Sequence, residues 1–529
     1  MTMEIRDLTL SLALALDDCR KEGKKSLTLE KGIYTLTPDH APCRPLSLSN
    51  HDAYGYTSIG LCLEDMDGFT LDGNGSTLIA DGVMISLAIL RSANITVKNL
   101  TFEARNTMRG EATVIAHHED GFTVRYTNDI DYTVRDGWLH YRDPYGHEDP
   151  HHYYMVIAKE GEAERYLPET RETFRTDYTF EDTGDRTVRL HNSPFCPELG
   201  ARLIMAPGFR HGCTIFLEDA SGILLENVTI HSSYGMGLLA QVSEDITVRS
   251  MRICPKDGAL YATANDATHF VNCRGTVRVL DSFFEGMLDD ALNVHGLYAR
   301  IDQVLPHGLL VRDMHPGAKG QAIYRKGCRV AVMDKRLLVP DAFYTVEDVL
   351  PINADVTYLA IKEPLEGVTP DMTLEELDGS PEVYFENNTV AYNRARGILL
   401  AGKKKTVIRN NVFRTPGASI MFESNGDYWY EAGGTTDVLI EGNHFDRCGY
   451  CTHVWGKSVI TGSARKDFDG KRYFHGSIVI RGNRFTQNVR PLVRLGNVTH
   501  AVFEDNEIEN LVSPNVYTDC LEVKDDTLE

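Results

Sequence analysis

The 529-residue sequence lacks a hydrophobic run long enough to span a bilayer. The apolar stretch Leu8 to Leu16 is too short, and Glu4 and Asp7 precede it rather than a basic region. Asp17 and Asp18 follow it where a secretion signal would carry small residues for cleavage. The stretch instead predicts a short amphipathic helix, capped near Asp7 and ending before Gly23.

Paired cysteine spacings are also scarce. The eleven cysteines are odd in number and lack the spacings of a disulfide framework, so we expect a reducing, cytoplasmic location. One Cys-x-x-Cys spacing occurs, from Cys448 to Cys451. Because no second pair or zinc-spaced histidines accompany it, we interpret these cysteines as buried strand residues rather than a metal or redox site.

Positive charge is under-represented. The chain has 54 basic and 76 acidic side chains, a formal net charge of -22, and the acids are scattered rather than gathered into a tail. Such a surface repels nucleic acid, anionic membranes and polyanionic glycans. We therefore expect no nucleic-acid or membrane partner, and a neutral substrate.

A repeat dominates what is present. Nine-residue segments recur with apolar residues at positions two, four and nine and often an Asn at position six or seven, as in "GILLENVTI" from Gly222, "DVLIEGNHF" from Asp437 and "SIVIRGNRF" from Ser477. The alternation predicts strands and the Asn predicts corners. In three cases, 222 and 245, 382 and 405, and 477 and 500, the segment starts are 23 residues apart. This period predicts an all-β chain folded as a parallel β-helix, in which each coil packs on its neighbours.

Two stretches break the repeat. The first is rich in Tyr, His, Asp and Thr, and the second has strand-like pieces separated by Pro and Gly. We interpret both as small inserted β domains, and the leading helix as a cap on the open end of the coils. The expected division is 1–116 for the cap and first coils, 117–192 for the first insertion, 193–297 for coils with the candidate acids, 298–379 for a second, barrel-like insertion, and 380–529 for the C-terminal coils.

Two adjacent carboxylates, Asp289 and Asp290, interrupt the segment "EGMLDDALNVHG". Asp266 precedes Asp289 by the interval that separates the repeated segments, so it can sit one coil away. Crowded carboxylates separate their pKa values, which lets one donate a proton while another activates water on either side of a glycosidic bond. His269, Asn293 and His295 flank these acids and could orient them or bind sugar hydroxyls. A calcium site and a solvated turn are the alternative interpretations of the acids.

A second polar group follows on later coils. Arg396 has the same offset in its coil as Asp290 has in its own. Arg396 and the nearby acids could make bidentate hydrogen bonds to sugar hydroxyls, and the ring of Trp429 could stack on a sugar face. Both features suit a pocket for a neutral sugar. The alternative to a sugar pocket is that the tryptophan packs at a coil corner and the charged side chains face solvent. The other candidate sugar-binding residues are Glu423, Asp427, Trp429 and Glu431.

The motifs "ATANDATHFVNCRG", "FFEGMLDDALNVHG", "RARGILL" and "DYWYEAGG" resemble those of glycoside hydrolase family 110 over most of the chain. That family comprises inverting α-galactosidases that remove terminal α-1,3-linked galactose, including from the blood group B determinant. The resemblance implies a right-handed β-helix with small barrel insertions, a galactose-terminated oligosaccharide as substrate, and a homodimer. It also implies that Asp289 is the proton donor, that Asp266 and Asp290 share the base role, and that the regions of Arg396 and Trp429 form the galactose pocket.

Three other functions fit a β-helix, because fold does not fix function. Polygalacturonase-like hydrolases have an adjacent Asp pair, but a separate Gly-His-Gly and an Arg-Ile-Lys are missing here. A polysaccharide lyase would need a metal, and a glycan-binding β-helix would not depend on Asp289. We expect an inverting glycosidase without metal or cofactor, with its working carboxyl groups about 6.5 to 9.5 Å apart.

Overall fold

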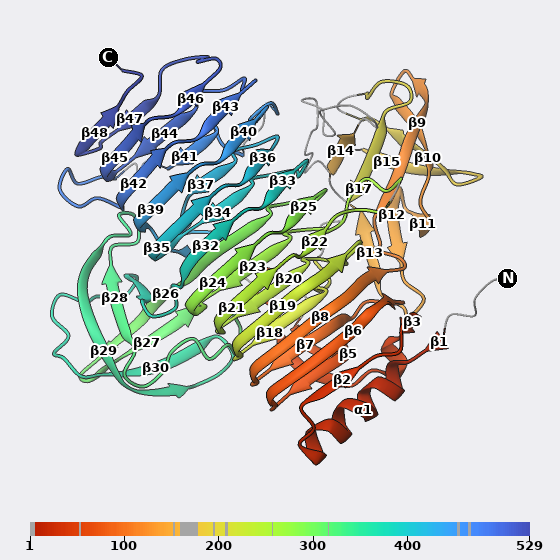
Figure 1. Cartoon of the computed structure of the whole chain (residues 1–529), viewed down its shortest axis with the longest axis horizontal. Coiled ribbons are helices and arrows are strands. Elements are labelled where there is room, and N and C mark those ends of the chain that lie inside the picture. Colours follow the sequence, from red (N-terminus) through yellow and green to blue (C-terminus); the bar gives the residue numbers. More distant parts are fainter. Residues whose placement is uncertain are drawn as a thin grey trace.

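The computed structural model describes residues 6–51, 54–151, 154–158, 178–193, 196–206, 210–256, 258–315, 317–451, 455–463 and 467–528. Part of the expected first insertion, 159–177, lies outside them. Figure 1 shows parallel strands stacked from the N-terminal to the C-terminal end of the chain, with the helix α1 (Thr9–Glu22) at the start. The chain is a parallel β-helix, as its repeat predicts.

One parallel sheet carries the candidate site, and we call it the site sheet. Its strands pair in the order in which they follow one another along the chain. They are β5 (Tyr54–Glu64), β7 (Ile85–Leu90), β18 (Ile215–Glu218), β20 (Leu238–Gln241), β23 (Thr268–Val271), β26 (Leu292–Leu305), β34 (Ile398–Leu400), β37 (Ile420–Phe422), β41 (Ile460–Gly462), β44 (Val493–Gly496) and β47 (Val516–Thr518).

A 21-stranded sheet forms the other faces of each coil. Its longer strands are β6 (Asp67–Ala80), β8 (Ala93–Ala104), β19 (Ser221–Ile230), β21 (Glu244–Arg249), β24 (Arg274–Leu280), β32 (Glu382–Glu386), β35 (Gly402–Arg409), β39 (Thr435–Glu441), β42 (His475–Arg481) and β45 (Val498–Glu504). Its shorter strands are β1 (Arg6–Asp7), β2 (Ser26–Thr28), β3 (Ile33–Leu36), β22 (Arg252–Ile253), β25 (Phe283–Glu285), β33 (Thr389–Ala391), β36 (Val412–Arg414), β40 (His444–Asp446), β43 (Arg484–Thr486), β46 (Glu507–Ile508) and β48 (Glu522–Asp525).

Strand register reproduces the period of the sequence. Ser221 pairs with Glu244, Val383 with Thr406 and Ser477 with His500, and each pair is separated by the interval of the sequence repeat. Inward-facing Val, Ile, Leu and Phe side chains fill one continuous core inside the coils. The predicted coil length is therefore confirmed.

Asparagines stack at one corner of the C-terminal coils. The side-chain oxygen of Asn443 accepts the backbone N–H of Asn411 at 2.9 Å, and its amide group donates to Asn483 at 2.9 Å and to the carbonyl of Ile408 at 2.8 Å. Asn388 and Asn506 extend the same ladder at its two ends. An amide carries both donors and an acceptor, so Asn satisfies buried backbone groups at each bend.

The helix α1 (Thr9–Glu22) lies at the N-terminal end of the coils. The carboxylate of Asp7 accepts the N–H of Thr9 at 2.9 Å, and Gly23 ends the helix with a left-handed φ of 67°. Leu12 and Leu16 are buried against the first coils. The predicted capping helix is confirmed. In the described residues, no helix is long and apolar enough to cross a membrane.

Antiparallel strands interrupt the coils in two places, on opposite sides of the stack in Figure 1. The first segment forms a six-stranded sheet of β9 (Gly110–His118), β10 (Gly121–Tyr126), β14 (Tyr154–Ala158), β15 (Thr179–Gly184), β16 (Thr187–His191) and β17 (Arg202–Ala206), with a three-stranded sheet of β11 (Asp131–Arg135), β12 (Trp138–Arg142) and β13 (Glu148–His151). This sheet begins and ends outside the expected limits 117–192, because β17 pairs with the start of β9.

The second segment closes on itself. Strand β26 pairs with both β27 (Gly308–Asp313) and β31 (Thr373–Glu376), and the ring continues through β30 (Val356–Ile361), β29 (Pro340–Pro351) and β28 (Arg329–Met333). We call this the antiparallel ring. Two short strands, β4 (Cys43–Ser47) and β38 (Glu431–Ala432), pair with β5 and β26. The 3-10 turn η1 spans Pro38–His40. The division into separate domains stays a prediction.

Candidate active site

Three polar residues occupy one position in three successive coils of the site sheet. Thr268 pairs with Leu292, and Leu292 pairs with Ile398. Asp266, Asp290 and Arg396 each lie two residues before one of these partners, in the turn that leads into the strand. The predicted stacking of Asp266 beneath the Asp pair and of Asp290 beneath Arg396 is therefore present.

The carboxylates are close together and buried. Asp266, Asp289 and Asp290 retain 3%, 8% and 0% of their exposed surface, so Asp289 is the most accessible of them. One oxygen from each lies within 4.8 Å of the other two. This nearest approach joins single oxygen atoms and is shorter than the separation between whole carboxyl groups expected of an inverting pair.

Three guanidinium groups face these acids. Arg396 donates its backbone N–H and its Nη2 to the two oxygens of Asp290, both at 2.8 Å. Nη2 of Arg210 lies 3.6 Å from one oxygen of Asp289, and Nη2 of Arg394 lies 3.8 Å from the other. Arg396 therefore supports the ionised form of Asp290 through two short hydrogen bonds.

Burial and mutual repulsion keep protons in the cluster. Burial, followed by the charge of Asp289, raises the pKa of Asp266 to about 8. Burial also raises the pKa of Asp290 well above its ordinary value, while Arg396 opposes this shift. Because Asp266 and Asp290 are in contact, a proton can be held by either of these two carboxylates. At neutral pH the cluster can hold a donatable proton and an ionised carboxylate side by side, as acid–base catalysis requires.

Imidazoles extend the cluster away from the carboxylates. Nδ1 of His269 lies 2.5 Å from Oδ2 of Asp266, and its Nε2 lies 2.9 Å from Nε2 of His295. Nδ1 of His295 is 2.7 Å from the carbonyl oxygen of Gly296. Nε2 of His295 also lies 3.7 Å from Oε1 of Glu431, which accepts a hydrogen bond from Asn50 at 3.1 Å.

Aromatic rings border the charged groups. The guanidinium of Arg210 lies 5.1 Å from the ring centre of Trp429, and that of Arg396 lies 4.7 Å from the ring centre of Trp455. Trp429 is half-buried. Each ring holds an arginine against the carboxylates through a cation–π contact.

Several buried polar atoms at this site have no hydrogen-bond partner among the described residues. They are Oδ1 of Asn50, Nε2 of His51, Oδ1 of Asn293 and Nε of Arg396. Buried polar atoms are rarely left unpaired in proteins. They are therefore available to the hydroxyl groups of a bound molecule.

A cation would compete with groups already present. Carboxylate oxygens suit calcium, but calcium takes six to eight oxygen ligands. Here Arg396 already occupies both oxygens of Asp290, and Arg210 and Arg394 flank Asp289. The donor set therefore fits an ion poorly.

Comparison with known proteins decides the family. A family model described as a right-handed β-helix region matches residues 376–526. The chain is 30% identical to an α-1,3-galactosidase B of Phocaeicola vulgatus, over 95% of this chain and 87% of that protein. It is 29% identical to an α-1,3-galactosidase B of Bacteroides fragilis, over 93% and 86%, and 28% identical to an α-1,3-galactosidase A of Shewanella woodyi, over 90% and 79%. The chain belongs to glycoside hydrolase family 110.

The fold is the one expected from the sequence. The coils are those of a right-handed parallel β-helix, as expected from the sequence. Among solved structures, an exopolygalacturonase from Thermotoga maritima matches with a TM-score of 0.42 and 11% identity, over 96% of this chain and 84% of that one.

The site of this family 110 chain gathers most of the residues singled out in the sequence. Asp266, Asp289, Asp290, His269, His295, Arg396 and Glu431 are joined by the contacts above. Asn293 pairs in register with His269, and Trp429 reaches Asp289 through Arg210. Glu423 is half-buried on the loop that leads to Glu431. Asp427 is exposed, and its carboxylate accepts the N–H of Tyr428 at 2.9 Å.

Other site residues gave no signal in the sequence. Arg210 and His51 come from segments far from the carboxylates and outside the repeat. His315 follows β27 of the antiparallel ring, and its Nε2 lies 2.8 Å from the hydroxyl of Ser49. Arg394 is the exception, because its place in "RARGILL" beside Arg396 could have identified it.

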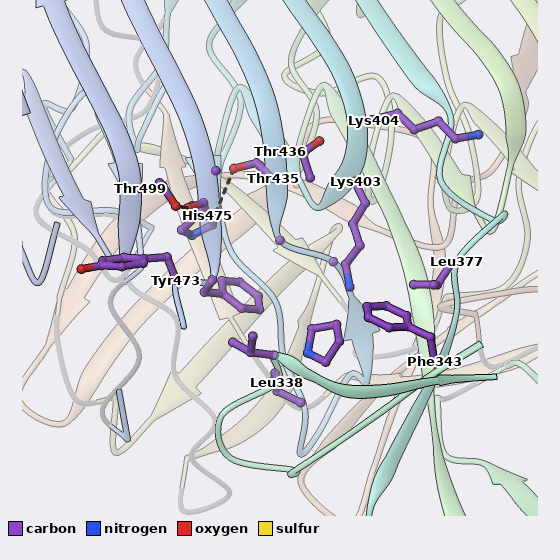
Figure 2. Close-up of a pocket in the computed structure, with 16 residues that line it drawn as sticks. Leu338, Phe343, Leu377, Lys403, Lys404, Thr435, Thr436, Tyr473, His475 and Thr499 are labelled. Atoms are coloured by element: carbon purple, nitrogen blue, oxygen red, sulfur yellow. Dashed lines mark hydrogen bonds between the residues drawn. The ribbon is translucent and has the colours of Figure 1, made fainter. Parts of the chain in front are cut away.

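A separate cavity lies between the antiparallel ring and the C-terminal coils. It has a volume of about 400 Å³, and Figure 2 shows Phe343 and Leu338 of the ring facing Tyr473 and His475 of the coils across it. Lys403 also lines it, and this side chain pairs with Glu375 at 2.5 Å. None of the carboxylates above is among the residues that line this cavity.

Proposed function

We propose that the chain is an exo-acting, inverting hydrolase that releases terminal α-1,3-linked galactose from neutral oligosaccharides without a metal or cofactor. The observation that carries this proposal is the buried cluster of Asp266, Asp289 and Asp290 in a member of glycoside hydrolase family 110. The α-1,3-galactosidase names of its relatives supply the sugar and the linkage.

Asp289 is the proposed proton donor. It is the most exposed of the three acids, so it can meet the oxygen of the leaving group. Asn393 donates to the backbone carbonyl of Asp289 at 3.0 Å and fixes this turn. The protonated carboxyl gives its proton to the glycosidic oxygen as the bond to galactose breaks.

We propose that Asp290 and Asp266 act together as the general base. Two hydrogen bonds from Arg396 favour the ionised form of Asp290, and the backbone N–H of Asp290 donates to Oδ1 of Asp266 at 3.1 Å. A water molecule held between these carboxylates would lose a proton to them while it attacks the anomeric carbon. Attack from the face opposite the leaving group inverts the configuration and forms β-galactose.

The proposed sugar pocket uses the unpaired polar atoms and the bordering ring. Asn50, His51 and Asn293 offer two acceptors and a ring nitrogen to sugar hydroxyls. Trp429 offers a half-buried face beside Arg210. A pocket with a few placed polar groups and an aromatic wall is typical of a neutral ligand.

The deciding experiment incubates the enzyme with α-1,3-galactobiose in the presence of EDTA and follows the released sugar by proton NMR. We expect β-galactose to appear before α-galactose, and Asp289→Asn to lower the rate by about 10²- to 10⁴-fold. Asp437→Asn is the matched control, because Asp437 is exposed on β39, outside the site. Early α-galactose would contradict inversion, and inactivity in EDTA that calcium restores would contradict a metal-free site.

A further inference from the structure

The hydrogen bonds of Asp266, His269 and His295 fix the number of protons that they hold. We call these three residues the histidine chain. Its three bonds join Asp266 to His269, His269 to His295, and His295 to the carbonyl of Gly296. Each bond needs one hydrogen, and two neutral imidazoles supply only two. All three hydrogen bonds of the histidine chain therefore form only when it carries one proton more than an ionised Asp266 with two neutral histidines.

The extra proton has two extreme positions. The carbonyl of Gly296 can only accept, so Nδ1 of His295 always carries a hydrogen. If the extra proton is on Asp266, Asp266 donates to His269 and His269 donates to His295. If it is on His295, both bonds reverse, and His269 donates to an ionised Asp266. The proton moves between these states along existing hydrogen bonds, without a change of rotamer.

Glu431 lies at the far end of the histidine chain. Its side chain is 9% exposed, and its Oε1 lies 3.7 Å from Nε2 of His295. Burial opposes its ionisation, but His295 and the hydrogen bond from Asn50 lower the pKa of Glu431. An ionised Glu431 attracts the extra proton toward His295 and away from Asp266.

The other charged groups around the histidine chain lie at its Asp266 end. Asp289, Asp290, Arg210 and Arg396 surround Asp266. Burial lowers the pKa of His51 and of His315 to about 3, so these two rings are neutral. Glu431 is thus the charged group that acts on His295 from β38.

We propose that Glu431, His269 and His295 are positioning residues that draw one proton away from Asp266, so that Asp266 is ionised when it acts as a base. This inference rests on the proposed function. In the reaction, Asp289 gives one proton to the leaving group and Asp266 or Asp290 accepts one from water while the extra proton stays at His295, so the total number of protons on the enzyme is unchanged. It gives Glu431 and both histidines a role other than sugar binding.

The test compares the pH profiles of the wild-type enzyme and Glu431→Gln. The substitution removes the counter-charge of His295, so the extra proton moves to Asp266 and the base is blocked at neutral pH. We expect kcat to fall about tenfold with little change in KM, and the acidic limb of the kcat profile to move up by about one pH unit. A sugar contact would instead raise KM and leave the limb in place, and that result would overturn the proposal.

A double-mutant cycle separates a relay from a direct charge effect. His269→Gln breaks the histidine chain, so Glu431→Gln added to it should cause no further shift of the acidic limb. Equal shifts in both backgrounds would also overturn the proposal. Glu218→Gln is the control, because Glu218 is another Glu on the site sheet that bonds to Gln241 at 2.7 Å. Unfolding temperatures of each variant show whether it folds.

The two proposals fail in different ways. If the wild-type enzyme releases no galactose from any α-galactoside, the proposed function fails. If it releases galactose but Glu431→Gln keeps the wild-type pH profile, only the role of the histidine chain fails. Nitrogen-15 NMR of the imidazoles offers a readout without substrate, since Nδ1 of His269 should lose its hydrogen in Glu431→Gln.

Discussion

At the scale of single residues, the carboxylate cluster opposes folding. Asp266 is 3% exposed, and burial first and Asp289 second raise its pKa to about 8, above the value of about 4 for an unfolded chain. Between these values the unfolded state has lost this proton, whereas the folded state retains it, on Asp266 or along the histidine chain. Stability conferred by this group is therefore present below about pH 4 and is lost as pH rises toward 8.

Asp266→Asn should therefore stabilise the protein, although it removes one of the two carboxylates proposed as general base. An asparagine amide can donate to His269 and its oxygen can accept from Asp290, so it supplies the third hydrogen of the histidine chain covalently. We expect the free energy of unfolding to rise by about 1–3 kcal/mol at pH 8 and by less at pH 5. Calorimetric unfolding at both pH values measures this. A gain of the same size at both would show that proton linkage is not the cause.

At the scale of elements, the asparagine ladder holds the corners of the C-terminal coils. Asn443→Ala would leave the backbone N–H of Asn411 and the carbonyl of Ile408 without their partners. We expect a loss of about 2–4 kcal/mol from two unpaired buried groups. Asn506→Ala, at the half-buried end of the ladder, should lose less. Urea unfolding of both variants tests this, and equal losses would contradict the ladder as the source of stability.

The elements also explain what the sequence could predict. The local alternation of apolar residues reveals the length of each coil. The register of the coils and the stacking of Asp290 beneath Arg396 could therefore be predicted by counting residues between segments. Arg210 and His51 could not be found in this way, because they reach the site from loops that have no periodic constraint. The same reason applies to Asp427, whose spacing from Trp429 did not reveal that it faces solvent.

At the scale of the whole molecule, a net charge of -22 acts on any charged substrate that approaches. A neutral α-galactoside should be indifferent to this field, so its kcat/KM should stay nearly constant from low to high salt. An anionic galactoside should be used poorly at low salt and better as salt screens the repulsion. Steady-state rates across a salt series measure both. A strong salt dependence with the neutral substrate would contradict a neutral-ligand pocket.

The pairing of Asp290 with Arg396 also bears on how the protein is made. These partners are 106 residues apart in sequence, and the antiparallel ring lies between them. The ribosome therefore delivers Asp290 well before its counter-ion, while the ring can close from strands that are already synthesised. Until Arg396 emerges, the nascent chain holds three carboxylates without their main cation. Catalytic competence would then appear only after the ring and the coil that follows it are both complete.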